Sequence, residues 1–148
     1  MFSNILVAVD GSDHALKAAD AACALAKVHG ARLVVLTVAK PVKGMSQNVK
    51  EYMYAEHIAG EPQYVLSEMA RSVLTEVENR ARKLSLANVK TVVREGQPAR
   101  RIVEYAKEHD VDLIVMGSRG LGDIGGMLLG SVSHKVNSLA ECSCLTVK

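Results

Sequence analysis

VDLIVMGSRG, residues 111–120, is a short apolar run that ends among glycines, and similar runs recur along the chain. A run of this length, rich in β-branched residues and closed by glycine, is typical of a strand buried on both faces. NILVAV at 4–9 and ARLVVLTVA at 31–39 have the same character. NVKTVVRE at 88–95 and CSCLTVK at 142–148 are less apolar but equally rich in strand-forming residues. We therefore predict that each of these runs forms a strand.

Stretches with a helical spacing of apolar residues separate the predicted strands. The first helix is predicted to begin at Ser12 or Asp13, either of which can cap it, and to stop at Gly30. Another helix is predicted from Glu61, with Pro62 in its first turn. Its apolar stripe consists of Val65, Met69, Val73, Val77, Ala81 and Leu84.

Two further helices are predicted in the second half of the chain. Pro98 opens the first of them. The residues of that helix that face inward are Ile102, Val103 and Ala106. Val132, Val136 and Leu139 mark the last helix. Residues 41–60 show no clear period and contain Pro, Gly, Ser, Gln and Asn, so we predict a loop there with room for a short helix.

This alternation of buried strands and amphipathic helices is typical of an α/β protein. We predict an open parallel sheet of five strands with helices on both faces. The crossover connections are expected to be right-handed. The chain contains no internal repeat, no low-complexity tract and no linker, so we expect a single domain over residues 1–148.

The composition limits the class of protein. Hydrophobic residues make up 49% and charged residues 23% of the chain, a balance that argues against disorder. A net charge of only +2 gives no electrostatic reason to expect nucleic acid or an anionic membrane as a partner. The apolar runs fall short of the roughly 20 residues of a membrane helix. With no secretory signal pattern and an odd number of cysteines, a cytoplasmic location is expected.

The candidate site residues follow the ends of predicted strands. In an open parallel sheet, ligands bind beyond the carboxyl ends of the strands, where the strand order reverses. Asp10 follows the first strand, and Val38 lies near the end of the second. GSRGLGDIGGMLLGS, residues 117–131, follows the fourth and holds six of the chain's eleven glycines. Because glycine costs order in the folded state, such a cluster needs a physical reason.

Three phosphate-binding patterns can be compared with this glycine stretch. GLGDIG at 120–125 has the letters of a dinucleotide fingerprint, but the acid that follows, Glu141, precedes the next strand instead of ending it. GGMLLGS at 125–131 has the glycine spacing of a Walker loop but lacks the lysine that grips the phosphates. The pattern G-x2-G-x9-G-[ST] fits without a gap. Its members are Gly117, Gly120, Gly130 and Ser131.

The third pattern has a physical rationale. Gly117 and Gly120 would let the backbone approach a ligand closely. Gly130 and Ser131 open the last helix, whose N–H groups and positive dipole end can receive phosphate. The hydroxyls of Ser131 and Ser133 are expected to add donors there. We therefore expect Gly117→Val or Gly130→Val to remove phosphate binding while the fold survives.

With these motifs the chain resembles the universal stress protein family over essentially its full length. The resemblance is carried by ILVAVDGS at 5–12, by REGQPARRIVEYAKEHDVDLIVMGSRG at 94–120, and by GSVSHKV at 130–136 with the glycines upstream of it. It implies the strand order 3-2-1-4-5 and a Rossmann-like adenine-nucleotide-binding fold. In members with this glycine pattern, it also implies a bound ATP or AMP.

The resemblance implies roles for individual residues around the base and the ribose. Asp10 is the implied carboxylate near the adenine and the ribose, with Ala8 and Val9 beside it. Val38 is the implied backbone contact to the adenine.

Further implied contacts lie along the glycine stretch. Met116 and Gly117 resemble the floor of the ribose–phosphate site, and Arg119 and Gly120 match the phosphate loop. The segment that holds the phosphates is matched by Gly130, Ser131, Val132 and Ser133.

The implied function is the binding of ATP, ADP or AMP in stress response or signalling. Whether Mg²⁺ or Mn²⁺ accompanies the nucleotide stays open, and no metal ligand is assigned. No residue is assigned a catalytic role, because no general base stands out that could activate water, so at most slow ATP hydrolysis is expected. Two alternatives stay open. One is an ATP-using enzyme of the same α/β class, and the other is an interaction module without a nucleotide.

The last predicted strand bears on assembly. It would lie at one edge of the sheet, where a bare apolar strand invites pairing, and in this family that edge commonly forms a two-fold dimer. We therefore expect a homodimer through residues 142–147. Cys142 and Cys144 share one face of this strand. We interpret them, like Cys23 in the first helix, as packing residues, although the family's usual Cys-Pro stretch is absent here.

Overall fold

The computed structural model describes residues 1–39, 62–122 and 129–148, and for 62–67 the backbone alone. Its strands are β1 (Asn4–Ala8), β2 (Arg32–Ala39), β3 (Val89–Glu95), β4 (Leu113–Gly117) and β5 (Ser143–Val147). They run parallel in one sheet in the order β3-β2-β1-β4-β5. The predicted sheet and its strand order are thus confirmed. The loop predicted at 41–60 and the side chain of Val65 lie outside the described residues.

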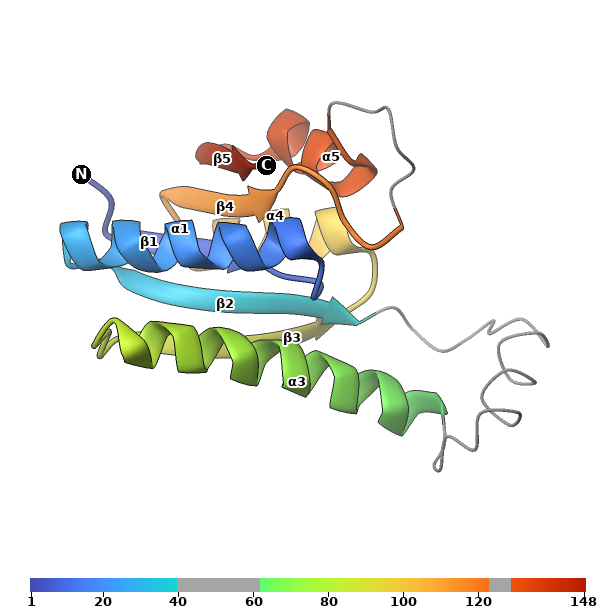
Figure 1. Ribbon diagram of the computed structural model, residues 1–148. Coiled ribbons are helices and arrows are strands. Elements are labelled where there is room, and N and C mark those ends of the chain that lie inside the picture. The colour runs from blue at the N-terminus through green and yellow to red at the C-terminus, as the bar shows by residue number, and fades with distance from the viewer. Residues whose placement is uncertain (40–61, 123–128) are drawn as a thin grey trace.

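Helices cover both faces of this sheet (Figure 1). They are α1 (Asp13–His29), α3 (Pro62–Lys83), α4 (Pro98–Glu108) and α5 (Ser131–Leu139). α1 and α3 pack on one face, and α4 and α5 pack on the other. No helix in the described part of the chain is both long enough and apolar enough to cross a membrane.

The core forms two apolar layers, one on each face of the sheet. The side chains of β1 contribute alternately to both layers. Ile5 and Val7 point into the layer beneath α1 and α3, whereas Leu6 points into the layer beneath α4 and α5. All three side chains are fully buried. The central strands therefore read as continuous apolar runs, because both of their faces are covered.

The helix ends follow local signals in the sequence. Ser12 caps α1, and its Oγ accepts a hydrogen bond from the N–H of Ala15 at 3.2 Å. Gly30 ends the same helix in the left-handed conformation, with φ of 63°, which glycine adopts without a Cβ penalty. Pro98 lies in the first turn of α4, where its missing N–H costs nothing.

The predicted apolar stripe of α3 is confirmed only in the C-terminal half of the helix. Val77 and Ala81 are buried, and Leu84 packs beside them. Met69 is 58% exposed, so its assignment to the buried stripe was wrong. The reason is geometric, because the buried face of α3 runs through Ala70, Leu74, Val77 and Ala81, and Met69 lies beside that face. Leu139 is also exposed, since it is the last residue of α5.

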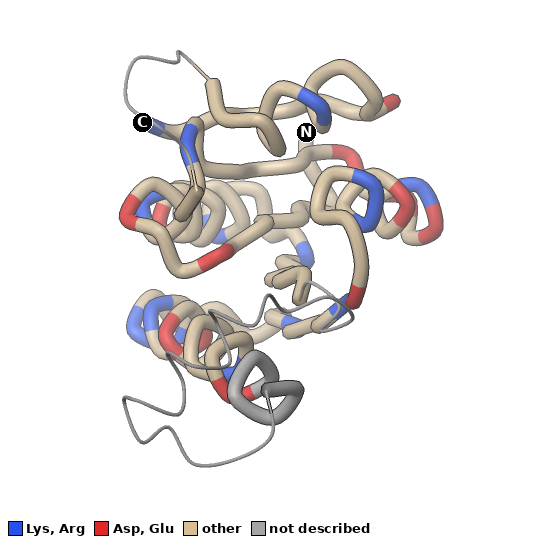
Figure 2. The backbone as a smooth tube through the Cα atoms, turned by 90° about the vertical axis from the view of Figure 1, so that its right-hand side faces the viewer, with Lys and Arg blue, Asp and Glu red and all other residues tan. Residues whose placement is uncertain are grey.

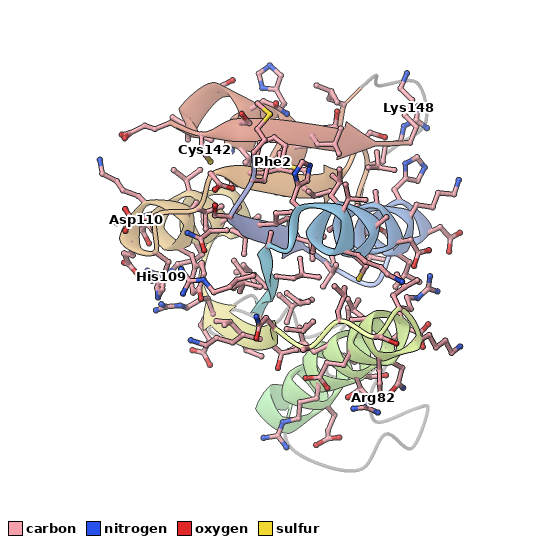
Figure 3. All side chains as sticks on the ribbon, turned by 90° about the vertical axis from the view of Figure 1, so that its left-hand side faces the viewer. Phe2, Arg82, His109, Asp110, Cys142 and Lys148 are labelled. Atoms are coloured by element: carbon pink, nitrogen blue, oxygen red, sulfur yellow. The ribbon has the colours of Figure 1, made fainter. Side chains whose placement is uncertain are left out.

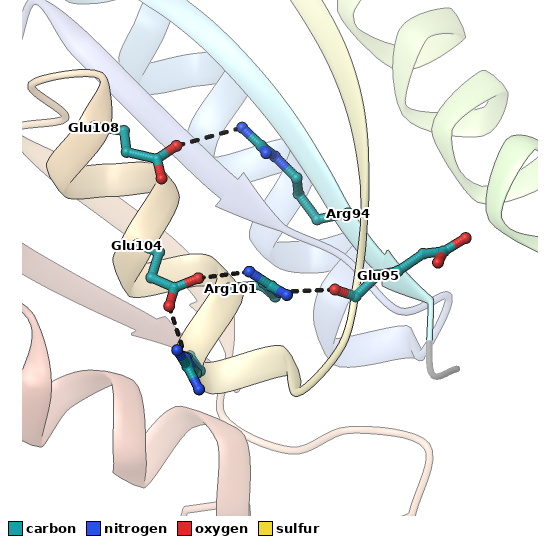
Figure 4. Close-up of polar contacts among 6 residues, drawn as sticks. Arg94, Glu95, Arg101, Glu104 and Glu108 are labelled. Atoms are coloured by element: carbon teal, nitrogen blue, oxygen red, sulfur yellow. Dashed lines mark hydrogen bonds and ion pairs between the residues drawn. The ribbon is translucent and has the colours of Figure 1, made fainter. Parts of the chain in front are cut away.

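Polar contacts connect α4 to the neighbouring strand β3 (Figure 4). Arg94 of β3 forms an ion pair with Glu108 at 3.4 Å. The Nε of Arg101 donates to the carbonyl oxygen of Glu95 at 2.7 Å, and its Nη1 lies 2.9 Å from Glu104. These side chains are largely exposed, so each ion pair adds little to stability. Because of these contacts, Arg94 and Arg101 already have hydrogen-bonding or ion-pair partners within the protein.

Cys23 leads to a prediction about alkaline stability. It is fully buried on the sheet-facing side of α1, and burial, with a smaller effect of Asp20, raises the pKa of its thiol from 9.0 to about 11. A pKa that is higher in the folded state favours folding at low pH, and this contribution is lost as pH rises from about 9 to 11. The free energy of unfolding, measured in urea, should therefore fall more steeply over this range in the wild type than in Cys23→Ala. Equal slopes would contradict the prediction.

Candidate functional site

The residues predicted to form the site lie at the carboxyl edge of the sheet. Ala8 at the end of β1 pairs with Leu36 of β2 on one side and with Met116 of β4 on the other. The chain leaves β1 toward β2 and later continues in β4 on the other side of β1, so the strand order reverses here. Figure 2 looks onto this edge, where basic and acidic residues are interspersed. The structure thus brings the ends of β1, β2 and β4 together, as expected.

Asp10 connects the turn after β1 with the glycine stretch after β4. Its Oδ1 accepts a hydrogen bond from the N–H of Ser12 at 2.9 Å, and its Oδ2 accepts one from the N–H of Leu121 at 3.1 Å. The first contact is the local turn that aspartate commonly forms with the backbone two residues on. The second spans 111 residues of sequence. Asp10 therefore holds the beginning of the glycine stretch against the end of β1.

Ser118 fastens the first turn of α5 to the end of β4. Its carbonyl oxygen accepts hydrogen bonds from the N–H of Gly130 at 2.6 Å and from the Oγ of Ser133 at 3.1 Å. Its own N–H donates to the carbonyl oxygen of Val147 at 2.7 Å. The last residues of the glycine stretch are therefore hydrogen-bonded to its beginning at Ser118. This holds the start of α5 directly beyond β4.

The side chain of Ser118 adds a contact to α1 that sequence reasoning missed. Its Oγ lies 3.0 Å from Nδ1 of His14, although 104 residues separate the two. Ser118 is only 2% exposed and the contact is partly buried, so this pair connects α1 to the phosphate-binding pattern. Ser118 occupies a variable position of G-x2-G, and nothing in the sequence near His14 indicates this contact.

Gly117 has a structural role different from the expected one. A Cβ built at this residue would lie 2.8 Å from the carbonyl carbon of His14 and 2.9 Å from the nitrogen of Ala15. Both are backbone atoms in the first turn of α1. The expectation that the fold would survive a side chain at Gly117 is therefore wrong, whereas the expected effect on ligand binding stays a prediction. Gly117 lacks a side chain because β4 and α1 approach each other there.

The hydroxyl of Ser133 is also used within the protein. Its Oγ donates toward the carbonyl oxygens of Ser118 and Gly130 at 3.1 and 3.0 Å, and the residue is buried. A serine hydroxyl has a single hydrogen to donate. The expected role of this hydroxyl as a donor to phosphate is therefore wrong, and Ser133 contributes to the site through its place in the first turn of α5.

Ser133→Ala tests this tie. The substitution removes a buried hydrogen-bond donor and leaves two carbonyl oxygens with one partner fewer. We expect a loss of about 1 kcal/mol in the free energy of unfolding, measured by urea denaturation. Ser138→Ala is the matched control, because the Ser138 hydroxyl makes a similar bond to His134 on the exposed side of the same helix. An equal loss of unfolding free energy in both variants would show that the buried hydrogen bonds of Ser133 stabilise the protein no more than the exposed bond of Ser138.

The start of α5 differs from the start of α1 at the same edge. α1 is capped by the side chain of Ser12 and has Asp13 in its first turn. α5 begins after Gly130, which has no capping side chain, and no acidic residue lies in its first turn. A helix start that lacks a capping side chain and an acidic residue in its first turn suits an anion such as phosphate. The donor set here fits the phosphates of a nucleotide better than that of α1 does.

Other predicted features can also be compared with the structure. Glu141 precedes β5 and pairs with Lys107 at 3.0 Å, so it does not lie at the carboxyl edge, as a dinucleotide fingerprint would need. Cys142 and Cys144 pack against the layer beneath α4 and α5, as expected, and burial raises the pKa of both thiols. In the described residues, no group of three or more His, Cys, Asp or Glu side chains could hold a metal ion.

Comparisons with known proteins agree with this geometry. The family model described as "Universal stress protein family" matches residues 1–148. Universal stress protein YxiE of Bacillus subtilis is 40% identical over 100% of both chains. A universal stress protein of Thermus aquaticus is also 40% identical over 100% of both chains. A crystal structure of a universal stress protein in complex with cAMP superposes with a TM-score of 0.74 at 28% identity, covering 99% of this chain and 97% of that one.

An open parallel sheet with a glycine-rich stretch that leads into an uncapped helix at its switch point is a nucleotide-binding type of α/β fold. This chain has that fold, and its relatives share it from end to end. The chain belongs to the universal stress protein family.

Proposed function

We propose that this protein binds an adenine nucleotide at the carboxyl edge of the sheet and passes on its nucleotide state in stress response. The observation that carries the proposal is the uncapped first turn of α5, held beyond β4 by the hydrogen bond from Gly130 to Ser118. A related protein of the same fold is described in complex with cAMP, which supports an adenine nucleotide as the ligand.

The residues proposed to contact the nucleotide are those at this edge. They are Ala8, Val9, Asp10, Val38, Met116, Gly117, Arg119, Gly120, Gly130, Ser131, Val132 and Ser133. The first turn of α5 would receive the phosphates through its N–H groups, because a helix start carries a partial positive charge. Asp10 would present its carboxylate toward the ribose and adenine while holding the glycine stretch.

Isothermal titration with ATP, ADP and AMP, each with and without Mg²⁺, tests this proposal. We expect saturable binding of at least one of them with one nucleotide per chain. The same series with Mn²⁺ shows which cation, if any, accompanies the nucleotide. No binding of any adenine nucleotide at millimolar concentration would overturn the proposal and favour an interaction module.

We also propose that the protein is not an enzyme of ordinary rate. Release of phosphate from Mg·ATP should stay below about one turnover per second, which is at the slow end of enzyme turnover. A faster rate, abolished by the same variants that abolish nucleotide binding, would instead support an ATP-using enzyme. We further infer that the chain acts in the cytoplasm as one domain.

A homodimer through β5 is the proposed assembly. Among the described strands, β5 lies at the edge of the sheet and pairs with β4 alone, and Leu145 in it is 37% exposed. An exposed apolar edge strand is a template for pairing with another chain. Sedimentation at micromolar concentration should show a species of twice the 15.9 kDa chain mass. Leu145→Lys should shift it to the monomer, whereas Leu139→Lys, an exposed leucine outside the strand, should not. A monomeric wild type would contradict the proposal.

A further inference from the structure

A cavity lies at the edge of the sheet opposite the proposed nucleotide site, where the strands begin. It has a volume of about 590 Å³, is open to solvent on one side, and is lined by the starts of β1, β2 and β3 and by the C-terminal end of α4. Figure 3 faces this edge and labels His109 and Asp110, which line the cavity. Pockets that hold small organic ligands have volumes of roughly 300–1,000 Å³. The cavity is therefore large enough for one such molecule, and it is remote from the proposed nucleotide site.

The register of the sheet places polar and apolar side chains in separate parts of this cavity. Asn4 pairs with Arg32, and Val34 pairs with Lys90. Because side chains alternate along a strand, Arg32 and Val34 face the same side, which is the side where Val34 packs beneath α4. Val111, after α4, is buried and adds to the apolar part of the lining. The cavity thus has an apolar floor and a basic rim.

Two cations on the rim are available to a ligand. Arg32 is oriented by Asn4, whose Oδ1 accepts from its Nε at 2.8 Å, while Asn4 in turn donates to the carbonyl oxygen of Asp110 at 3.1 Å. In the described part of the chain, neither Arg32 nor Lys90 forms an ion pair, in contrast to Arg94 (Figure 4). Asp110 is an acid in the lining, so two cations face one carboxylate and the rim has a net positive charge.

Tyr105 gives the cavity an unused hydrogen-bond donor. The residue is 2% exposed and lines the cavity, with its ring stacked on His109 at 4.0 Å between centroids and beneath Arg94 at 5.4 Å. No described residue accepts a hydrogen bond from its hydroxyl. In the described residues, the only buried side-chain nitrogen or oxygen atom without a partner is Oδ1 of Asp112, so the Tyr105 hydroxyl is accessible to solvent. Burial, the largest cause, raises the pKa of Tyr105, so the phenol keeps its proton at neutral pH.

We propose that this cavity binds a small carboxylate with an apolar, aromatic body. The carboxylate would lie between Arg32 and Lys90, and the apolar body would lie over Val34, beside the aromatic wall that Tyr105 and His109 form. Charge-assisted hydrogen bonds to arginine and lysine are the strong ones for a carboxylate. This proposal does not depend on nucleotide binding, because the two sites lie at opposite edges of the sheet.

The proposal is tested with 1-naphthoate as the probe, by titration followed in ¹H–¹⁵N spectra of the full chain saturated with ATP. We expect saturable shifts at the starts of β1, β2 and β3 and at the end of α4. Arg32→Gln and Lys90→Gln should each raise the dissociation constant about tenfold. Tyr105→Phe, which removes only the hydroxyl, should also weaken binding. Lys27→Gln is the control, because Lys27 is an exposed lysine at the end of α1, on the other face.

Each outcome of the 1-naphthoate titration either supports the proposed carboxylate site or overturns it. Arg32 and Lys90 are exposed, so their variants are expected to fold, and the shifts of the wild type locate the ligand even if one does not. Shifts confined to Asp10 and the glycine stretch would overturn the proposal, as would the absence of shifts at millimolar 1-naphthoate. Equal affinity in Lys90→Gln, Arg32→Gln and Lys27→Gln would also overturn it. Failure of nucleotide binding would leave this test unaffected, because it can be repeated without ATP.

Discussion

Gly117→Ala is expected to lower the free energy of unfolding by about 3 kcal/mol, the upper part of the range for inserting atoms into a packed site. The new Cβ would lie 2.8 and 2.9 Å from backbone atoms of His14 and Ala15. A flexible side chain could move aside, but the first turn of α1 is fixed by the cap from Ser12 and by packing against β4. The end of β4 and the start of α1 would have to separate.

Urea denaturation of the wild type, Gly117→Ala and Gly122→Ala measures this effect. Gly122 is a matched control, because it lies in the same glycine stretch but a Cβ there meets no atom of the described residues within 4 Å. We expect its unfolding midpoint to stay within experimental error of the wild type. If Gly117→Ala were as stable as Gly122→Ala, the close approach of β4 to α1 would not be the reason for the glycine.

Gly130→Val is expected to weaken ATP binding about 100-fold, the loss that follows when one or two charge-assisted hydrogen bonds to phosphate are prevented. Gly130 precedes the first turn of α5 and has φ of −69° and ψ of 164°, extended values that valine also adopts. The backbone can therefore accept the change, but a branched side chain would stand at the helix start where phosphate is proposed to bind.

Titration calorimetry with ATP compares Gly130→Val with Gly122→Val, a substitution in the same stretch but outside the G-x2-G-x9-G pattern. Because Gly130 is buried, thermal unfolding must first show that the variant still unfolds cooperatively. Gly130→Ala provides a smaller change should valine prevent folding. Unchanged ATP affinity in a folded Gly130 variant would show that the phosphates do not bind at the start of α5.

Much of the fold followed from the sequence because the signals for it are local. The strands β1, β2 and β4 are buried on both faces, so each appears in the sequence as a run of consecutive apolar residues. Helix limits were predictable where a single residue sets them, as Ser12 and Gly30 do for α1. Met69 was misplaced because several apolar stripes can be drawn along this helix, and the buried one passes through Ala70 and Leu74.

The network around the site was less predictable because its contacts join distant parts of the chain. Nothing in the spacing of Ser118 and His14 indicates that their side chains meet. Gly117 could not be interpreted from the sequence for a different reason. A glycine there is compatible both with a ligand that lies close to the backbone and with a helix that packs close to it. Only the position of α1 decides between them. The cavity around Arg32 and Tyr105 draws on separate strands and a helix, so no motif marks it.

The residues assigned to the nucleotide rest on the resemblance to the family and on the edge of the sheet that they share. The structure places the ends of β1, β2 and β4 at one edge, and it changes the reasons given for Gly117 and for the hydroxyl of Ser133. Their contacts with a nucleotide remain predictions.

Mass spectrometry of the small molecules released when the purified protein is denatured tests nucleotide binding most directly. We predict an adenine nucleotide in the extract, close to one per chain, or an empty extract from a protein that then binds added ATP or AMP. An extract without nucleotide, followed by no heat on titration with Mg·ATP or AMP, would contradict a nucleotide site at the start of α5.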